Sequence, residues 1–309
     1  MNITQLKAKF KKGKFTKSEF IRKALDCHRE LFNYVDIVRT TDVKEICISD
    51  DGILFAMEGG ISLFCPPDES RVVPLEVMNF DKYEHEETRV IDMLSENARH
   101  ILDIGGNIGW YSVRFAKRLP EAKIFSFEPM PSSYEYLQRN VAINHVGTQV
   151  FTYNFGLSDS SGVVEFFVPL TNGTNASLKN VAGEPDAMAV TALTLTLDQW
   201  VANQNVAPDF IKCDVEGAEL LVFRGGRDTL AKYRPVVFTE LLRKWSKPFG
   251  YHPNDLIGFF AELGYLCFAV GFSGARRTDE ITEQTVETNY CFLHSKDHAS
   301  LILELERKS

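Results

Sequence analysis

Residue types that could bind a ligand are concentrated in residues 100–111, which read HILDIGGNIGWY. An apolar run carries one acid, Asp103, and leads into a loop with glycines at 105, 106 and 109. Glycines have no Cβ, so the backbone can pass close to a ligand. The helix start that follows offers free N–H groups. The stretch predicts a strand, a tight loop and a helix, the first crossover of a ligand-binding α/β sheet.

The spacing of these glycines and the charge of Asp103 indicate the kind of ligand. A dinucleotide-binding loop follows the pattern G-x-G-x-x-G, and this loop does not. A carboxylate also repels a pyrophosphate, whereas S-adenosylmethionine has a cationic ammonium and a cationic sulfonium. The sequence therefore favours S-adenosyl-L-methionine as cofactor, and an NAD-dependent oxidoreductase stays as an alternative.

A second acid stands where a ribose would be bound. Glu128 directly follows the predicted strand 123–127 and lies 25 residues after Asp103. An acid at the end of the second strand is placed to bind a ribose diol, because one carboxylate can accept hydrogen bonds from two hydroxyls. We therefore expect Glu128 to bind the cofactor.

Three more polar residues are candidates for the same cofactor. Ser158 and Asp159 follow a third predicted strand, 149–155, and Asp159 either accepts from the adenine amine or belongs to a hairpin turn. Glu86 lies in an acidic segment before the first strand. Its carboxylate either faces the cofactor or favours the N-terminus of a helix.

A cluster of acids follows the predicted strand 210–213. Asp214, Glu216 and Glu219 lie within six residues of each other, at the sheet edge where open α/β proteins bind substrates. Capping of the next helix would explain one or two of these acids. Because there are three, we favour a role in the site.

Transfer of a methyl group to a hydroxyl benefits from a base that removes the proton. Asp214 and Glu216 are the first candidates for this base, and Glu240 and His145 are the next. Asp214 and Glu216 could also bind a divalent metal, since Mg²⁺ prefers carboxylate and water oxygens. No spacing in the sequence requires a metal.

Composition and charge exclude several classes of protein. The 309 residues are 44% hydrophobic and 25% charged, typical of a globular protein, with no apolar run long enough for a membrane helix. The six scattered cysteines predict reduced thiols in the cytoplasm. Residues 1–23 hold eight Lys or Arg and one acid, so the net charge of −8 leaves −15 on the remainder. This acidic remainder argues against nucleic acid as a partner.

The chain divides into three parts by its patterns. Residues 1–78 predict an extension of two helical segments and a small β-meander, with a linker around Pro66 and Pro74, and this extension could form a homo-oligomer contact. Residues 79–297 predict an alternating α/β domain, including a long polar loop at 169–189 that we expect to be functional. Residues 298–309 predict a short helical tail.

The motifs together resemble those of the FkbM family of methyltransferases. The similarity covers residues 80–242 and includes Glu86 and the segments LDIGGNIGWYS (102–112), FSFEPMPSSYEYLQRNVAIN (125–144), GLSDSSG (156–162), LTLDQW (195–200) and IKCDVEGAEL (211–220). The family usually has alanine where Gly106 stands, and a small residue there should do the same job. The first 75 residues fall outside the match.

The resemblance implies an α/β fold of the class I methyltransferase (Rossmann-like) type, with a seven-stranded sheet and helices on both faces. It implies S-adenosyl-L-methionine as donor and O-methylation of a hydroxyl on a sugar, glycan or natural product. The family's cofactor positions correspond to Asp103, Gly105, Asn107, Gly109, Glu128 and Asp159. A catalytically inactive Rossmann-like scaffold is the non-enzyme alternative.

Overall fold

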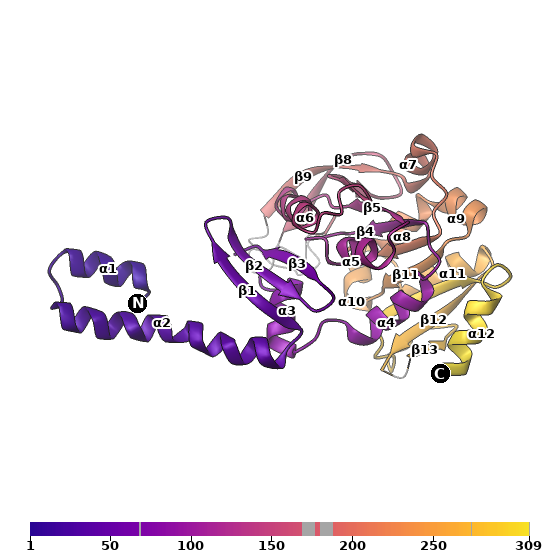
Figure 1. Cartoon of the computed structure of the whole chain (residues 1–309). Coiled ribbons are helices and arrows are strands. Elements are labelled where there is room, and N and C mark those ends of the chain that lie inside the picture. Colours follow the sequence, from indigo (N-terminus) through magenta and orange to yellow (C-terminus); the bar gives the residue numbers. More distant parts are fainter. Residues whose placement is uncertain (68, 169–176, 180–187, 273, 309) are drawn as a thin grey trace.

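The computed structural model describes residues 1–309 except 68, 169–176, 180–187, 273 and 309 (Figure 1). Among the described residues, a central eight-stranded sheet has the order β13-β12-β14-β11-β10-β4-β5-β6. Its strands are β4 (His100–Ile104), β5 (Lys123–Phe127), β6 (Val150–Tyr153), β10 (Phe210–Cys213), β11 (Val236–Glu240), β12 (Tyr265–Gly271), β13 (Gly274–Arg277) and β14 (Asn289–His294).

The strand pairing agrees with the seven-stranded sheet that the resemblance implies. β6, β5, β4, β10 and β11 run parallel, and β14 is antiparallel to both β11 and β12. The seven predicted strands are therefore present. β13 adds an eighth by folding back on β12 at the sheet edge, through a turn at Gly271 and Gly274. The strand order reverses between β4 and β10, and such a switch point opens a crevice for a ligand.

Helices cover both faces of this sheet, because its strands are apolar on both sides. Neighbouring residues of β4 show this: Ile101 belongs to one buried cluster and Leu102 to the other. The first cluster is covered by α4 (His85–Leu94), α5 (Trp110–Arg118), α6 (Pro131–Ile143) and α12 (Ala299–Lys308). The second is covered by α7 (Leu197–Gln204), α8 (Glu219–Arg224), α9 (Arg227–Tyr233) and α11 (Pro253–Glu262).

A small second sheet lies beside the carboxyl end of the main sheet. Its order is β7-β9-β8, from β7 (Gly156–Leu157), β8 (Gly162–Val168) and β9 (Met188–Leu195). The sequence predicted the last two strands but not a separate sheet. Of the predicted functional loop 169–189, the structure describes residues 177–179 and 188–189, and the other residues lie outside its description. After β11, α10 (Arg243–Ser246) leads into a 3₁₀ helix (Lys247–Phe249).

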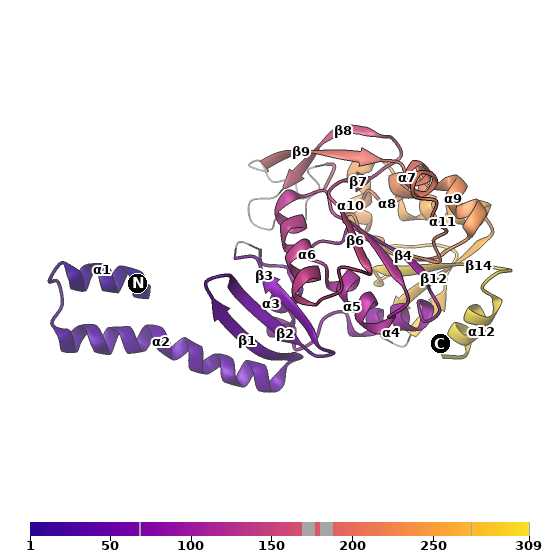
Figure 2. The same ribbon diagram turned by 45° about the horizontal axis from the view of Figure 1, so that its top comes forward.

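The N-terminal extension forms an arm and a meander (Figures 1 and 2). Its elements are α1 (Ile3–Lys11), α2 (Lys17–Thr40), β1 (Val43–Ser49), β2 (Gly52–Met57), β3 (Ile61–Cys65) and α3 (Val73–Phe80). The two helices and the meander confirm the prediction. The predicted linker extends less far than Pro74, because helix α3 begins at Val73. Proline is tolerated in the first turn of a helix, where its missing N–H is not needed.

Two asparagines of α6 join the meander to the α/β domain. Asn140 Oδ1 accepts from Phe64 N at 2.7 Å, and Asn144 Oδ1 accepts from Ser62 N at 2.9 Å. The two residues are four positions apart, so they share one face of the helix. Their side chains supply the β3 edge with the partners that another strand would give.

Candidate active site

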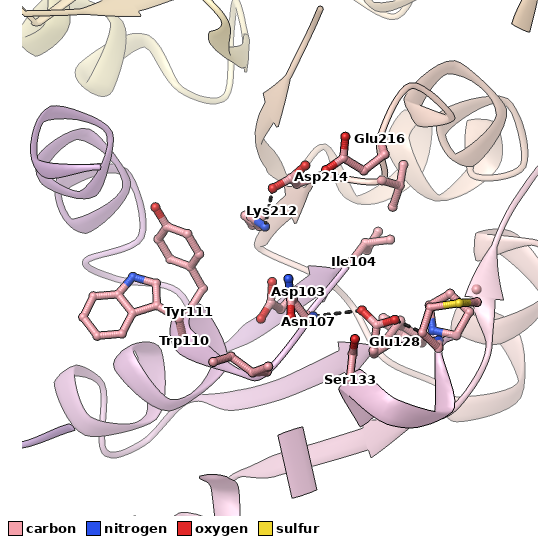
Figure 3. A pocket seen from close by; sticks show the side chains of 18 of the residues that line it. Asp103, Ile104, Asn107, Trp110, Tyr111, Glu128, Ser133, Lys212, Asp214 and Glu216 are labelled. Carbon is pink, nitrogen blue, oxygen red and sulfur yellow. Dashed lines mark hydrogen bonds and ion pairs between the residues drawn. The ribbon is translucent and has the colours of Figure 1, made fainter. Parts of the chain in front are cut away.

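A pocket opens at the carboxyl ends of β4, β5 and β10, where the strand order reverses (Figure 3). It encloses about 1040 Å³ of empty space, part of it open to solvent. The glycine-rich loop after β4 lies on one side, and Lys212, Asp214 and Glu216 lie on the other. Residues 71–73 of the extension also line it. The sequence predicted a site at this edge but gave the extension no certain part in it.

Glycines are required in the loop because the backbone packs closely. Gly105 has φ +81°, and a Cβ built on it would lie 1.8 Å from the carbonyl oxygen of Asp214. Gly109 has φ +94° and precedes α5. A Cβ on Gly106 would meet Ser126 Oγ at 2.2 Å. Alanine at 106 therefore requires the Ser126 hydroxyl to turn away, which the prediction from the family pattern did not foresee.

Asp103 is fully buried at the floor of the pocket. Its Oδ2 accepts from Ser112 Oγ at 2.5 Å, whereas its Oδ1 is buried without a hydrogen-bond partner among the described residues. Burial raises the pKa of Asp103, and the nearby positive charge of Lys212 acts in the opposite direction. An unsatisfied buried carboxylate oxygen is costly, so Asp103 Oδ1 is ready to accept a donor from a ligand.

Glu128 closes the other side of the glycine loop. Its Oε2 accepts from the backbone N of Asn107 at 2.9 Å, and its Oε1 accepts from the backbone N of Met130 at 2.8 Å. Burial raises the pKa of Glu128 to about 7, and these two hydrogen bonds act against that rise. Each carboxylate oxygen keeps a second acceptor position. The Oδ1 of Asn107 is also buried without a partner in the described part of the chain.

Lys212 is the main residue of the site that sequence reasoning missed. It is buried in β10, and its Nζ lies 3.2 Å from Asp214 Oδ2 and 5.1 Å from the centre of the Tyr111 ring. Burial alone would lower its pKa, but the charges of Asp214, Asp103 and Glu84 raise it overall. The available signal was a lysine inside an apolar strand and two residues before an acid.

Glu86, for which the sequence left open a place at the cofactor or at a helix N-terminus, lies in the first turn of α4, and Glu84 is the acid that joins the network. Glu84 has φ +41° just before α4, and its Oε2 accepts from the Tyr111 hydroxyl at 2.5 Å. Burial raises the pKa of Glu84, and the charge of Lys212 counters this rise. Glu86 lies one residue inside the helix, outside the pocket lining, and pairs with Arg89 at 3.0 Å. Glu84, just before the helix start, therefore reaches Tyr111 of α5, whereas Glu86 reaches Arg89 of its own helix.

The acids after β10 have different surroundings. Glu219 Oε1 accepts from the backbone N atoms of Val215 and Gly217, each at 3.1 Å, and its Oε2 accepts from the Tyr251 hydroxyl at 3.2 Å. Glu219 therefore holds the loop in shape, whereas Asp214 and Glu216 line the pocket.

The pKa is raised more for Glu216 and for Glu240, at the end of β11, than for Glu219. Burial, followed by the charges of Asp214 and other acids, raises the pKa of Glu216 to about 8 and that of Glu240 to about 9. The positive charge of Arg71 lowers the pKa of Glu216. Glu240 ends β11 and is not among the described residues that line the pocket.

Comparison with known proteins agrees with this geometry. The model of the "Methyltransferase FkbM domain" matches residues 103–267, more than half of the chain. This chain belongs to the FkbM methyltransferase family. The match begins at Asp103, so the arm, the meander and Arg71 lie outside it.

Curated relatives of this methyltransferase support the same conclusion. It is 31% identical to methyltransferase sdnD of Sordaria araneosa, over 50% of this chain and 69% of that protein. It is 33% identical to the hexuronic acid methyltransferase AglP of Haloferax volcanii, over 49% and 61% of the two chains. It is 28% identical to the 2-O-methyltransferase NoeI of Sinorhizobium fredii, over 49% and 67%.

The remaining predicted residues of the methyltransferase are not among the described residues that line the pocket. His145 is exposed after the C-terminal end of α6, which runs back from the pocket to the opposite sheet edge, so it does not join the catalytic candidates. Ser158 is buried and Asp159 is exposed, and neither lines the pocket, although Gly156 and Leu157 just before them do.

Two general expectations can be compared with the described residues. No group of three or more His, Cys, Asp or Glu side chains there could hold a metal ion. Within the same residues, no helix has both the length and the apolar character needed to cross a membrane. The six cysteines are free thiols.

Proposed function

We propose that this methyltransferase transfers a methyl group from S-adenosyl-L-methionine to a hydroxyl oxygen of a sugar, glycan or natural product. The observation that carries the donor assignment is the buried, unpartnered Oδ1 of Asp103 beside a glycine loop without side-chain bulk. A positively charged group that donates a hydrogen bond would satisfy that oxygen, and the ammonium group of S-adenosyl-L-methionine is such a group.

The residues present fit this donor. Asp103 would hold the ammonium, and the free acceptor positions of Glu128 would hold the ribose hydroxyls. Leu157 and Phe166 would form an apolar wall for the adenine ring. When bound, the donor supplies a methyl group on a positively charged sulfur. A pyrophosphate would instead meet the carboxylates of Asp103 and Glu128, which counts against a nicotinamide cofactor.

Glu216 is the base that the surroundings favour. Its carboxyl faces the pocket, and a pKa of about 8 matches removal of a hydroxyl proton near neutral pH. Asp214, held by Lys212, would then orient the acceptor hydroxyl. In this proposal Glu216, one of the two first candidates from the sequence, is the base, and Asp214, the other, positions the acceptor.

The class of acceptor is proposed from the relatives. Two of them are described as a hexuronic acid methyltransferase and a 2-O-methyltransferase. Arg71 stands at the pocket wall close enough to Glu216 to affect its pKa. A positive group beside the base suits an acceptor that carries a carboxylate, such as a hexuronic acid.

Calorimetry with S-adenosyl-L-methionine tests the donor assignment. We expect binding by the native protein, loss of binding in Asp103→Ala and in Glu128→Ala, and near-native affinity with reduced turnover in Asp214→Asn. Glu121→Ala, which removes an exposed acid away from the pocket, is the matched control. A folded protein that binds no donor would favour the inactive scaffold, and binding of a nicotinamide instead would favour an oxidoreductase.

Equal donor affinity in Asp103→Ala, Glu128→Ala and Asp214→Asn would contradict the division of roles. The acceptor would be sought by incubating a panel of sugars and uronic acids with labelled donor. Transfer of label to a hydroxyl supports the proposal, whereas transfer only to an amine or a carbon would overturn it.

A further inference from the structure

The arm formed by α1 and α2 leaves an apolar face of α2 uncovered. α1 packs antiparallel to the first half of α2: Phe10 stacks on Phe20 with ring centres 4.5 Å apart, and Cys27 Sγ contacts the carbonyl oxygen of Met1. α2 has 24 residues and is about 36 Å long. Most of it projects from the α/β body with no other element beside it (Figures 1 and 2).

The exposed apolar residues of α2 form a regular line, here called the α2 seam. Its members alternate at spacings of four and three residues: Ile21, Leu25, His28, Phe32 and Val35. At 100° per residue all five fall within an arc of about 80°. The four apolar members are between 44% and 69% exposed. This spacing is the one by which helices pack against other helices.

A second apolar face appears where α1 ends. Leu31 and Tyr34 lie on the same side of α2 as α1, but beyond the end of α1. Their exposed fractions are 53% and 42%. The arm therefore presents helix surface that is covered in its first half and open in its second half. A partner that supplies another α1 at this place would complete the pattern.

We propose that the occupant is a second copy of this chain, with the two α2 helices packed antiparallel along the α2 seam. With His28 at the two-fold axis, Ile21 of each copy meets Val35 of the other, and Leu25 lies opposite Leu31 and Phe32. The partner's α1 then lies over the open face at Leu31 and Tyr34. The four helices of the two arms thus form one antiparallel assembly around the paired α2 helices.

Charge favours this arrangement over parallel pairing. The arm tip, residues 1–16, has five lysines and no acid. Residues 42–65, which include the meander at the base of the arm, have five acids and one lysine. Antiparallel packing brings each basic tip to the acidic base of the other copy, whereas parallel packing brings tip to tip and base to base.

The same charges argue against an anionic membrane as the occupant. Asp26, Glu30 and Asp36 are exposed on α2, between and just after the members of the α2 seam. An anionic surface would repel these carboxylates. Five of the seven lysines of the arm also lie in residues 1–16, before the exposed apolar residues of α2, whereas an interfacial helix carries both kinds of residue along its whole length.

Sedimentation of the full chain gives the first test. We expect the native protein to sediment as a dimer of about 70 kDa, twice the chain mass of 35.0 kDa. Leu25→Glu combined with Phe32→Glu should give a folded monomer, because both side chains are exposed in one copy. Asn33→Glu adds charge on another side of α2 and should leave the dimer intact. A native monomer at 50 μM, or a dimer that survives the double variant, would overturn the proposal.

Cross-linking tests the antiparallel direction. Ile21→Cys combined with Val35→Cys should form a disulfide between copies under mild oxidation, joining position 21 to position 35. Val35→Cys alone should not form one between the two introduced cysteines. A 35–35 link in the single variant means parallel packing and would overturn the proposed arrangement. Vesicles with anionic lipid, added to the native protein, should not dissociate the dimer. Binding of monomeric protein to these vesicles would contradict the proposal.

Discussion

Replacement of Lys212 by methionine tests whether one buried cation balances the acids of the site. Asp214 is in contact with its Nζ at 3.2 Å, and Asp103 and Glu84 both influence its pKa. Methionine keeps much of the apolar length of the side chain but removes the charge. Breaking a buried ion pair by removing one partner costs about 3–5 kcal/mol, because the other charge stays buried and unpaired.

We therefore expect Lys212→Met to lower the free energy of unfolding by about 3–5 kcal/mol at pH 8. For a chain of 309 residues that is a drop of about 5–8 °C in the unfolding temperature. Lys117→Met, which removes an exposed lysine from α5, is the matched control and should change stability by less than about 0.5 kcal/mol. Urea unfolding monitored by circular dichroism measures both.

The pH dependence of this loss has a definite sign. Burial already raises the pKa values of Asp103 and Glu84 in the folded protein, and removing Lys212 raises them further. A group whose pKa is raised on folding binds more protons in the folded state, so stability falls as pH rises from its unfolded pKa toward its folded pKa. The variant should therefore lose less stability at pH 5 than at pH 8.

A double-mutant cycle separates this account from simple loss of packing. Asp103→Asn in the Lys212→Met background removes one unpaired carboxylate, so it should recover part of the lost stability. If the two substitutions are additive, or if Lys212→Met costs less than about 1 kcal/mol at both pH values, Lys212 does not balance these acids.

Three further predictions follow from the site and the meander. With Glu216 as base, kcat/KM should rise about tenfold between pH 7 and pH 9, because a group of pKa about 8 goes from about one tenth to about nine tenths ionised; Glu216→Gln should remove this rise, and a rise that persists assigns the base elsewhere. Gly105→Ala should abolish donor binding in calorimetry, since its Cβ would overlap the Asp214 carbonyl, and native affinity would contradict the tight packing. Asn144→Ala should cost about 1–3 kcal/mol in urea unfolding by leaving Ser62 N unpaired; no loss would mean that water replaces it.

Local patterns were sufficient to predict the parts of the site that depend on one segment. The strand at 123–127 and the loop after His100–Ile104 follow from short apolar runs and glycines, and Glu128 follows from its place at a strand end. These features depend on backbone geometry within a few residues. For the same reason the two helices and the meander of the extension were predicted from sequence.

The errors concern contacts between distant segments. His145 looked suitable by type, but the direction of α6 places it at the wrong sheet edge. Glu84 and Glu86 differ by two residues, and only the start of α4 at His85 decides which one reaches Tyr111. Lys212 was overlooked because much of its importance comes from Asp103 and Glu84, which lie on two other segments of the chain.

The extension takes part in the site as well as in the proposed dimer, and this affects how acceptors are chosen. Asp103 and Glu128, which would hold the donor, lie within the family match, whereas Arg71, Val72 and Val73 line the same pocket from outside it. Methyltransferases that share a donor need similar residues to bind it, whereas different acceptors need different residues around them. Arg71 lies near Glu216, where the acceptor hydroxyl would lose its proton. We therefore expect the part of the chain outside the family match to help select the acceptor.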